Sequence, residues 1–478
     1  MNVPSFAFLG FAALAALLVN LSSAPGWRRT IFLLANLAFI LSFTRSVVQL
    51  APFGALLLLG FASLKLMERY KNKAAFVVLM AALIASFCLL KRYAFVPPTF
   101  FLTFAYFAVG MSYVFFRILH LVIDAYQDAL PGRVGLLSYA NYTLNFTSLV
   151  SGPIQLYPEY HRMENSAPAT LGEPAVGRAL ERIVVGFFKV SAISPLLGYL
   201  HERAVGWAAM QSALGFRVAD AALILAIFPV FLYINFSGYM DFVIGVARFM
   251  RLELPENFNR PFVSAGFIEF WGRWHMTLSN WLKTYVYSPL LLNLMRRFPS
   301  PRVEPFLGVL TYFVTFFLIG LWHGPTSMFI VYGVLLGLGV SVNKLYQILM
   351  IRRMGRARYR TLCAGPLYAA LSRGLTFVWF AFSMLWFWST WPQLGKLVAE
   401  LGPAAIVAGI AVVLGVSALA LTGLKYVEER LPQFTAGGGS VLTSRYVRTA
   451  WCTVLAVLVI SITVALNAPA PHIVYKAF

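Results

Sequence analysis

Long apolar stretches recur along almost the whole chain, and they limit the folds that are open to it. Each runs close to the ~20 residues that an α-helix needs to cross a hydrocarbon layer of about 30 Å. They are too long and too continuous for the alternating strands of a membrane β-barrel. Backbone polar groups inside a bilayer must be satisfied within the protein, so helices are the expected element. The sequence therefore predicts an all-α polytopic membrane protein.

The composition agrees with this class. Of the 478 residues, 60% are hydrophobic and 12% are charged, whereas soluble domains carry about 25% charged residues. The length criterion predicts roughly 11 to 13 membrane-embedded helices. The expected segments are 5–22 (a retained span rather than a signal peptide), 30–44, 46–65, 74–90, 99–118, 137–155, 178–200, 220–248, 306–321, 327–346, 374–391, 404–424 and 447–466. No soluble insertion or repeat is evident, which predicts one integral-membrane domain over 1–478.

Basic residues cluster between the apolar stretches. The chain has 38 Lys and Arg against 17 Asp and Glu, a net charge of +21. Loops such as "MIRRMGRARYR" (350–360) and "LMRRFPSPR" (294–302) are expected on the cytoplasmic side, where loops are rich in Lys and Arg. The charge therefore indicates membrane topology and not nucleic-acid binding. Three cysteines, far apart, predict neither a disulfide framework nor a metal site.

A histidine lies in a short turn between two apolar stretches, "FFLIGLWHGPTSMFIVYG". Polar groups at membrane depth are costly and tend to mark function. A neutral imidazole can act as general base toward an alcohol, because its pKa lies near working pH. His323 is therefore a candidate catalytic residue, and a buried histidine that only packs is the alternative.

The region 253–290 interrupts the apolar pattern and contains three tryptophans. A helical wheel from Phe267 predicts one amphipathic helix lying along the cytoplasmic interface. His275 falls at the edge of its apolar face. Interfacial helices of this kind usually carry no chemistry, so a structural role for His275 stays open. The preceding "LPENFNRPF" supplies Asn257 and Asn259 in non-helical backbone.

Other catalytic patterns are missing from the sequence, which has no G-x-S-x-G, G-x-x-x-x-G-K or H-E-x-x-H. "HLVID" places His120 and Asp124 one helical turn apart, which predicts a structural contact. Ion transport is a rival function, with Asp241 paired to Arg248 and Glu181 to Lys189 as candidate intramembrane charges. The missing inverted repeat argues against it.

Several motifs together resemble the signature of the membrane-bound O-acyltransferase (MBOAT) family. These are "PENFNRPF", "EFWGRWHMTLSNWLKTYVYSPL" and "GLWHG", preceded by "YTLNFTSLVSGPIQLYPEY" and "FSGYMDFVIGVARFM". The resemblance covers roughly 100–345, the expected core of the domain. It implies a ring of helices around a central tunnel, with interfacial amphipathic helices. It also implies that His323 is catalytic and that His275 assists, by positioning or by polarising the acyl carbonyl. The candidate substrate-binding residues are Trp322, Trp274, Arg273, Glu269, Asn257, Asn259 and Asp241.

Within the family, the sequence is most similar to the bacterial branch that modifies envelope glycans. This implies an O-acyltransferase of the bacterial inner membrane that passes an acyl group, expected to be acetyl, to hydroxyls of a secreted or envelope polysaccharide. The donor would be a cytoplasmic thioester, either acetyl-CoA or an acyl carrier protein, and no bound cofactor or metal is expected. A periplasmic acyl-transfer partner is a further expected partner. D-alanyl transfer from a carrier protein, or acylation of a lipid or protein, remain alternatives.

Overall fold

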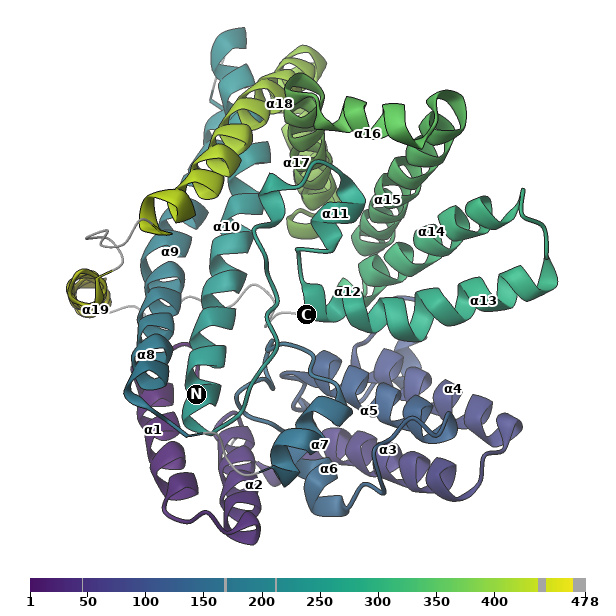
Figure 1. The fold of residues 1–478 in the computed structure, drawn as a ribbon, viewed down its shortest axis with the longest axis vertical. Coiled ribbons are helices and arrows are strands. Elements are labelled where there is room, and N and C mark those ends of the chain that lie inside the picture. The colour runs from purple at the N-terminus through teal and green to yellow at the C-terminus, as the bar shows by residue number, and fades with distance from the viewer. Residues whose placement is uncertain (45, 167–169, 211–212, 437–443, 467–478) are drawn as a thin grey trace. The chain divides into compact units, whose positions relative to one another are not determined.

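Helices form all the regular structure in the described part of the chain. The computed structural model describes residues 1–44, 46–166, 170–210, 213–436 and 444–466 (Figure 1). These residues divide into two compact units. The first comprises 1–191, 235–256 and 455–466, and the second comprises 192–234 and 257–454.

The first unit contains the N-terminal helices and the C-terminal part of α10. Its helices are α1 (Phe6–Asn20), α2 (Pro25–Leu41), α3 (Ala51–Arg69), α4 (Lys73–Leu90), α5 (Met111–Tyr126), α6 (Leu136–Thr143), α7 (Tyr157–Asn165) and α8 (Glu173–Phe188), with short 3-10 turns at Val47–Leu50 and Pro98–Phe100. Its core includes a group of aromatic rings centred on Phe8, whose centroid lies 5.4 Å from that of Phe39 and 5.9 Å from that of Phe242.

The second unit contains the later helices, and α10 (Leu214–Phe249) runs from it into the first unit. Its helices are α9 (Ser194–Ala208), α11 (Phe267–Trp271), α12 (Met276–Leu282), α13 (Ser288–Arg297), α14 (Glu304–His323), α15 (Ser327–Met354), α16 (Arg356–Ala364), α17 (Pro366–Trp388) and α18 (Trp391–Ala436). Helix α19 (Arg445–Leu466) begins in this unit and continues into the first unit from Leu455 on. A 3-10 turn spans Pro261–Val263, and π-helical turns span Lys189–Ile193 and Lys283–Tyr287.

The all-α polytopic prediction is confirmed. Nine helical segments in the described residues are long and apolar enough to cross a membrane. Each is at least 18 residues long and contains an 18-residue window with at most two charged residues. A helix of that length is close to the thickness of a hydrocarbon core. The protein is therefore a multi-pass membrane protein.

Two of the expected segments differ from a simple span. The helix expected over 99–118 begins at Met111, after Gly110, whose φ is +72°. A Cβ at Gly110 would lie 2.1 Å from the carbonyl oxygen of Leu149, so only glycine fits. The helix expected over 137–155 ends at Thr143 and is followed by irregular backbone.

A buried arginine explains how that irregular backbone is tolerated. Arg117 is fully buried, and its guanidinium donates to the carbonyl oxygens of Thr143 and Ser148 at 3.0 and 2.9 Å. The carbonyl groups that a helix would have satisfied are thus satisfied by a side chain. Local hydropathy carries no trace of this long-range solution.

The "HLVID" contact is confirmed as a structural one. His120 Nδ1 lies 3.2 Å from Asp124 Oδ2, and His120 Nε2 lies 2.6 Å from the hydroxyl of Tyr142. That hydroxyl donates in turn to the backbone oxygen of Gln155 at 2.6 Å. All of these groups are buried, so this network holds α5 against the segment that follows α6.

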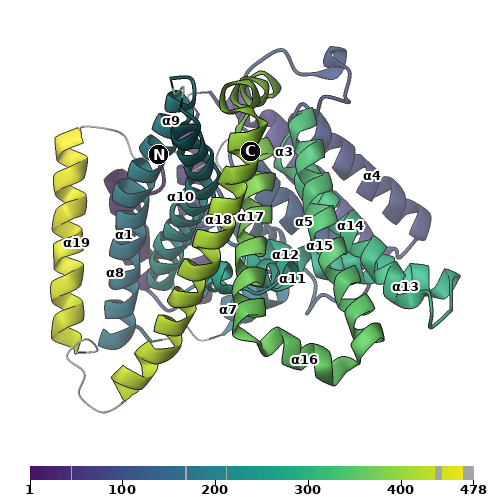
Figure 2. The ribbon, with the colours of Figure 1, turned by 90° about the horizontal axis from the view of Figure 1, so that it is seen from above.

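Helices α14 and α15 form a closely packed antiparallel pair, which lies side by side in both ribbon views (Figures 1 and 2). Glycine permits the close approach: a Cβ on Gly320 would lie 2.1 Å from the Cα of Gly333. Helix α14 ends at the candidate residue His323, so the packing of this pair decides where that side chain lies.

Two amphipathic helices in the second unit bury none of their residues. They are α13, which ends with Arg296 and Arg297, and α16, which contains three arginines. Figure 2 shows α16 connecting the lower ends of α15 and α17. Short, basic and unburied helices between spans are typical of segments that lie along a membrane surface.

Candidate functional site

The region around His275 differs from the single interfacial helix that the sequence predicts. Helix α11 ends at Trp271, and α12 begins at Met276. Between them His275 adopts a left-handed conformation, with φ 44° and ψ 51°. The apolar face, including Phe270 and Leu278, is buried within the second unit and not against lipid. His275 itself is 1% exposed, so its ring is surrounded by protein.

Asn257 determines which nitrogen of His275 carries the proton. The Asn257 Oδ1 accepts hydrogen bonds from the Thr277 backbone N–H at 3.1 Å and from the Thr277 hydroxyl at 2.8 Å. The same oxygen lies 3.1 Å from His275 Nδ1. Because Oδ1 only accepts, Nδ1–H must donate, and the lone pair of the neutral ring is on Nε2.

Burial keeps this ring neutral. Removal from water disfavours the charged imidazolium and lowers the pKa of His275 to about 3. The ring is therefore uncharged throughout the physiological pH range. A neutral imidazole with its proton on Nδ1 offers Nε2 as a hydrogen-bond or proton acceptor.

His323 is the last residue of α14 and is 2% exposed. The chain turns at Gly324, where a Cβ would lie 2.2 Å from the ring of Phe329. The His323 ring contacts Tyr332 of α15 and Phe387 of α17, at centroid distances of 5.6 and 5.2 Å. An imidazole at the end of the helix is thus held by aromatic rings from the two neighbouring helices.

Trp322 brings the two histidines together. Its ring centroid lies 4.7 Å from that of His323 and 6.4 Å from that of His275. The two imidazoles predicted from separate motifs therefore contact the same indole within the second unit. Trp322 is 8% exposed, so the group is shielded from bulk water.

The other predicted residues of this region make contacts near the turn that contains His275. Trp274 is buried in an aromatic cluster, with ring centroids 5.5 Å from Phe270 and 4.9 Å from Phe380. Arg273 is partly exposed and pairs with Glu269 at 3.0 Å. The Asn259 backbone N–H donates to the carbonyl oxygen of Arg273 at 2.9 Å. These contacts hold the segment before α11 against the turn that contains His275.

Asp241 belongs to the first unit, and its predicted pairing is wrong. Its carboxylate accepts from Arg182 at 3.0 Å and from Lys189 at 2.7 Å, whereas Arg248 pairs with Glu253. Arg182 and Lys189 lie on α8 and the π-helical turn that follows it. The sequence could not show this arrangement, because the partners are more than fifty residues apart in the chain.

Four residues with a clear structural role at this site were not predicted from the sequence. Thr277 orients Asn257, while Tyr332 and Phe387 pack on His323. Arg373 is buried and donates to the carbonyl oxygen of Val263 at 3.1 Å, which ties the Asn257 segment to α17. Of these four residues, only Arg373 could have been noticed in the sequence, because it is an arginine next to an apolar stretch.

Comparison with known families agrees with the motifs. The model described as MBOAT, membrane-bound O-acyltransferase family, matches residues 70–372. The chain belongs to the membrane-bound O-acyltransferase family. The matched region contains both histidines of this MBOAT protein, together with Asn257, Trp322 and α14 to α16.

Curated relatives of this MBOAT protein modify different envelope polymers, according to their names. A probable alginate O-acetylase of Pseudomonas fluorescens is 29% identical over 56% of this chain and 50% of its own length. A teichoic acid D-alanyltransferase of Bacillus subtilis is 28% identical over 47% and 56%. A peptidoglycan O-acetyltransferase of Helicobacter pylori is 30% identical over 44% and 38%. The chain thus spans about half the length of the curated relatives it matches.

Proposed function

We propose that this protein is an O-acyltransferase that moves an acyl group, expected to be acetyl, from a cytoplasmic thioester to hydroxyl groups of an envelope or secreted polysaccharide. The observation that carries the proposal is the buried pair His275 and His323 on either side of Trp322. Relatives named for O-acetylation of alginate and of peptidoglycan support the choice of acetyl and polysaccharide.

In the proposed reaction, His323 acts as general base. It takes the proton of the acceptor hydroxyl as the oxygen attacks the thioester carbonyl carbon. The carbon–sulfur bond then breaks, and the proton passes to the leaving thiolate, which gives an ester and a free thiol. Burial of the pair excludes the water that would otherwise hydrolyse the thioester.

His275 would assist by accepting a hydrogen bond. Its Nδ1–H is committed to Asn257, so the neutral ring has no second N–H to donate to an acyl carbonyl. Of the two supporting roles that the family resemblance implies, positioning the acceptor hydroxyl through Nε2 fits this tautomer. Asn257 Nδ2 is a buried amide donor that makes no hydrogen bond within the described residues, and we propose that it polarises the acyl carbonyl instead.

The second candidate is D-alanyl transfer, and the relatives named teichoic acid D-alanyltransferase favour it. The same two histidines would serve, since only the acyl group, its carrier and the acceptor polymer differ. We further propose location in the bacterial inner membrane, where a cytoplasmic donor and an external polymer are both within reach. A periplasmic protein that passes the acyl group onward fits either version.

The test compares ester-linked acyl groups on envelope glycans from cells with the native protein and cells with His323→Ala. NMR and base-release mass spectrometry would identify the group as acetyl or alanyl. We expect loss of one signal by a factor of at least about 100, as for removal of a general base. His161→Ala, at a partly exposed histidine of α7, is the matched control at equal membrane abundance. Unchanged glycans in His323→Ala would contradict the proposal.

A further inference from the structure

A cavity of about 360 Å³ lies in the first unit, in a region that contains none of the predicted site residues. Its walls come from the end of α1, the start of α2, the end of α7 and the residues just after α10. The argument depends on three arginines that line it, Arg28, Arg29 and Arg251, and on one acidic residue, Glu164.

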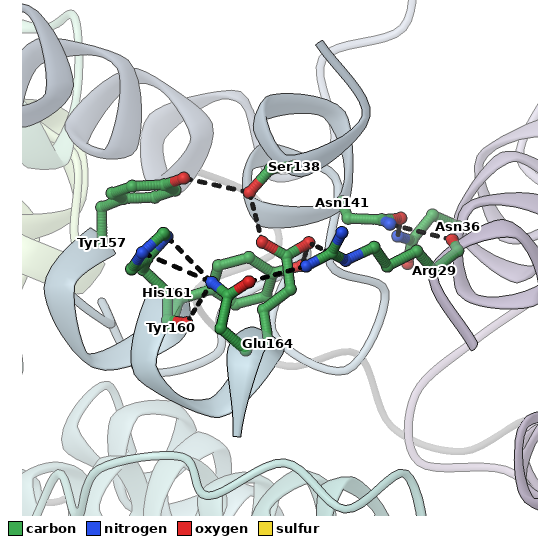
Figure 3. Close-up of polar contacts among 9 residues, drawn as sticks. Arg29, Asn36, Ser138, Asn141, Tyr157, Tyr160, His161 and Glu164 are labelled. Carbon is green, nitrogen blue, oxygen red and sulfur yellow. Dashed lines mark hydrogen bonds and ion pairs between the residues drawn. The ribbon is translucent and has the colours of Figure 1, made fainter. Parts of the chain in front are cut away.

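Arg29 and Glu164 form an ion pair (Figure 3). Arg29 Nε lies 3.4 Å from Glu164 Oε1, and its Nη2 donates to Asn165 Oδ1 at 2.8 Å. The second oxygen of Glu164 accepts from the hydroxyl of Ser138 at 2.5 Å. This pair is therefore part of the wall, and the positive charge of the cavity comes from the two remaining arginines.

Arg28 is the group that a ligand would meet. It is half-buried and makes no ion pair or side-chain hydrogen bond with any residue that the structure describes. Burial, and secondly the nearby charge of Arg251, lower the pKa of the Arg28 guanidinium. Two like charges held together in a partly buried site raise the free energy of the empty cavity, and a bound anion would relieve that cost.

The first turn of α2 adds to the positive potential. Ser23 and Pro25 both line the cavity, so the N-terminus of this 17-residue helix faces it. The N-cap residue Ala24 provides no side-chain hydrogen bond to the first turn. Uncapped N–H groups and the helix dipole favour an anion at such a position, in addition to the two guanidinium groups.

The rest of the lining is apolar, with Val19, Phe32 and Met250 among its residues. Leu21 and Trp27, beside the cavity on the same two helix ends, are 64% and 41% exposed. Exposed leucine and tryptophan at helix ends are typical of the boundary between lipid and water. A cationic cavity at this boundary suits a ligand with an anionic head and an apolar body.

We propose that this cavity is a binding site for a phosphate ester group, presented by the head of an anionic phospholipid. The planar guanidinium of arginine donates two parallel hydrogen bonds to phosphate oxygens, and Arg28 has donors to offer. Arg28 and Arg29 make this end of α2 basic, and basic helix ends are expected on the cytoplasmic side, so the lipid would come from the inner leaflet. A soluble phosphate ester has the same chemistry and is distinguished below.

The test measures lipid and phosphate binding by the full chain purified in an uncharged detergent. Native mass spectrometry would compare dioleoyl phosphatidylglycerol with dioleoyl phosphatidylcholine, which has the same chains but no net charge, and with glycerol 3-phosphate as the soluble probe. Arg28→Gln removes the charge, Arg28→Lys keeps it, and Arg133→Gln removes an exposed charge from a loop outside the cavity. Arg28 has no partner to lose among the described residues, so its variants should unfold at the native temperature.

We expect phosphatidylglycerol to bind about tenfold more weakly to Arg28→Gln than to the native chain or to Arg133→Gln. Arg28→Lys should keep most of the affinity. Tight binding of phosphatidylglycerol without competition from glycerol 3-phosphate supports the lipid source. Binding of glycerol 3-phosphate that depends on Arg28, with the two lipids equal, supports the phosphate site and replaces the lipid by a soluble ester. If no probe depends on Arg28, the proposal is wrong.

Discussion

His275 occupies a backbone conformation that costs free energy, because a residue with a Cβ is disfavoured at positive φ. Such positions cost on the order of 1–3 kcal/mol and persist when their surroundings hold them in place. Here the constraint is the Asn257 side chain, whose oxygen binds the His275 ring and both polar groups of Thr277. The strain is consistent with a ring that is held in one orientation for chemistry.

As the pH is lowered, the free energy of unfolding of the native protein should decrease more steeply than that of His275→Asn. The folded-state pKa of about 3 lies below the ~6.5 of an exposed histidine. Between these values the unfolded state binds the extra proton, so acid favours unfolding. We expect this histidine to contribute a loss of about 3 kcal/mol between pH 7 and pH 4.

Denaturant unfolding in detergent at a series of pH values measures this effect. Asparagine tolerates the left-handed conformation, so His275→Asn should fold and should lack this contribution, while its acyl transfer falls. His161→Asn, at a partly exposed position, is the control and should keep the native slope. Equal slopes for the native protein and His275→Asn would show that the folded and unfolded states bind protons alike at this ring, so that burial does not lower its pKa.

At the scale of elements, the α14–α15 pair determines where His323 lies. The two helices approach closely at Gly320 and Gly333, and the turn between them packs Gly324 against Phe329. Without a hydrophobic driving force between helices in lipid, small residues permit the close packing that stabilises a pair. The glycines around the Trp-His sequence thus have a packing role that does not depend on the chemistry proposed for His323.

Gly320→Ala should therefore lower both stability and activity. The new Cβ would lie 2.1 Å from the Cα of Gly333, so the helices must separate, and we expect a loss of about 2–3 kcal/mol by analogy with overpacked cores. Gly395→Ala on α18 is the matched control, because its Cβ would meet no atom within 4 Å. Thermal unfolding and acyl transfer would be measured for both. A Gly320→Ala protein with native stability would show that the pair does not need this contact.

At the scale of the whole molecule, the exposed basic residues allow two candidate acyl donors, a carrier protein and coenzyme A, to be distinguished. Lys283, Arg296 and Arg297 are exposed, and α13 buries none of its residues. Acyl carrier proteins are acidic, and encounters steered by opposite charges weaken with salt. Coenzyme A presents fewer charges to such a surface.

If a carrier protein is the donor, the triple change Lys283→Gln, Arg296→Gln and Arg297→Gln should raise the KM for the acylated carrier about tenfold or more at low salt, with kcat little changed. The difference should shrink as ionic strength rises from 0.05 to 0.5 M, in proportion to screening. Radiolabelled acyl transfer with each purified donor measures this. A KM that depends neither on these charges nor on salt would assign the thioester to coenzyme A.

Much of the molecule was predictable from the sequence because the relevant signals are local. The length of an apolar stretch decides whether a helix can span a membrane, and His323 stands out because its neighbours are apolar. Hydropathy was misleading after α6, where the side chain of Arg117 supplies hydrogen bonds that a continued helix would have made. Similarly, a helical wheel could not show the break between α11 and α12 at His275. The side chain that supports this break, Asn257, lies outside both helices.

The sequence by itself determined the class of the protein, most of its spans and the two histidine motifs. Only the tertiary structure decided that Trp322 contacts both imidazoles, which ring nitrogen of His275 carries the proton and which partners neutralise Asp241. It also brought Arg28 and Arg251 to one cavity from distant parts of the chain. The physical reason is that hydrophobicity acts on each segment by itself, whereas hydrogen bonds, ion pairs and cavities depend on which segments pack together.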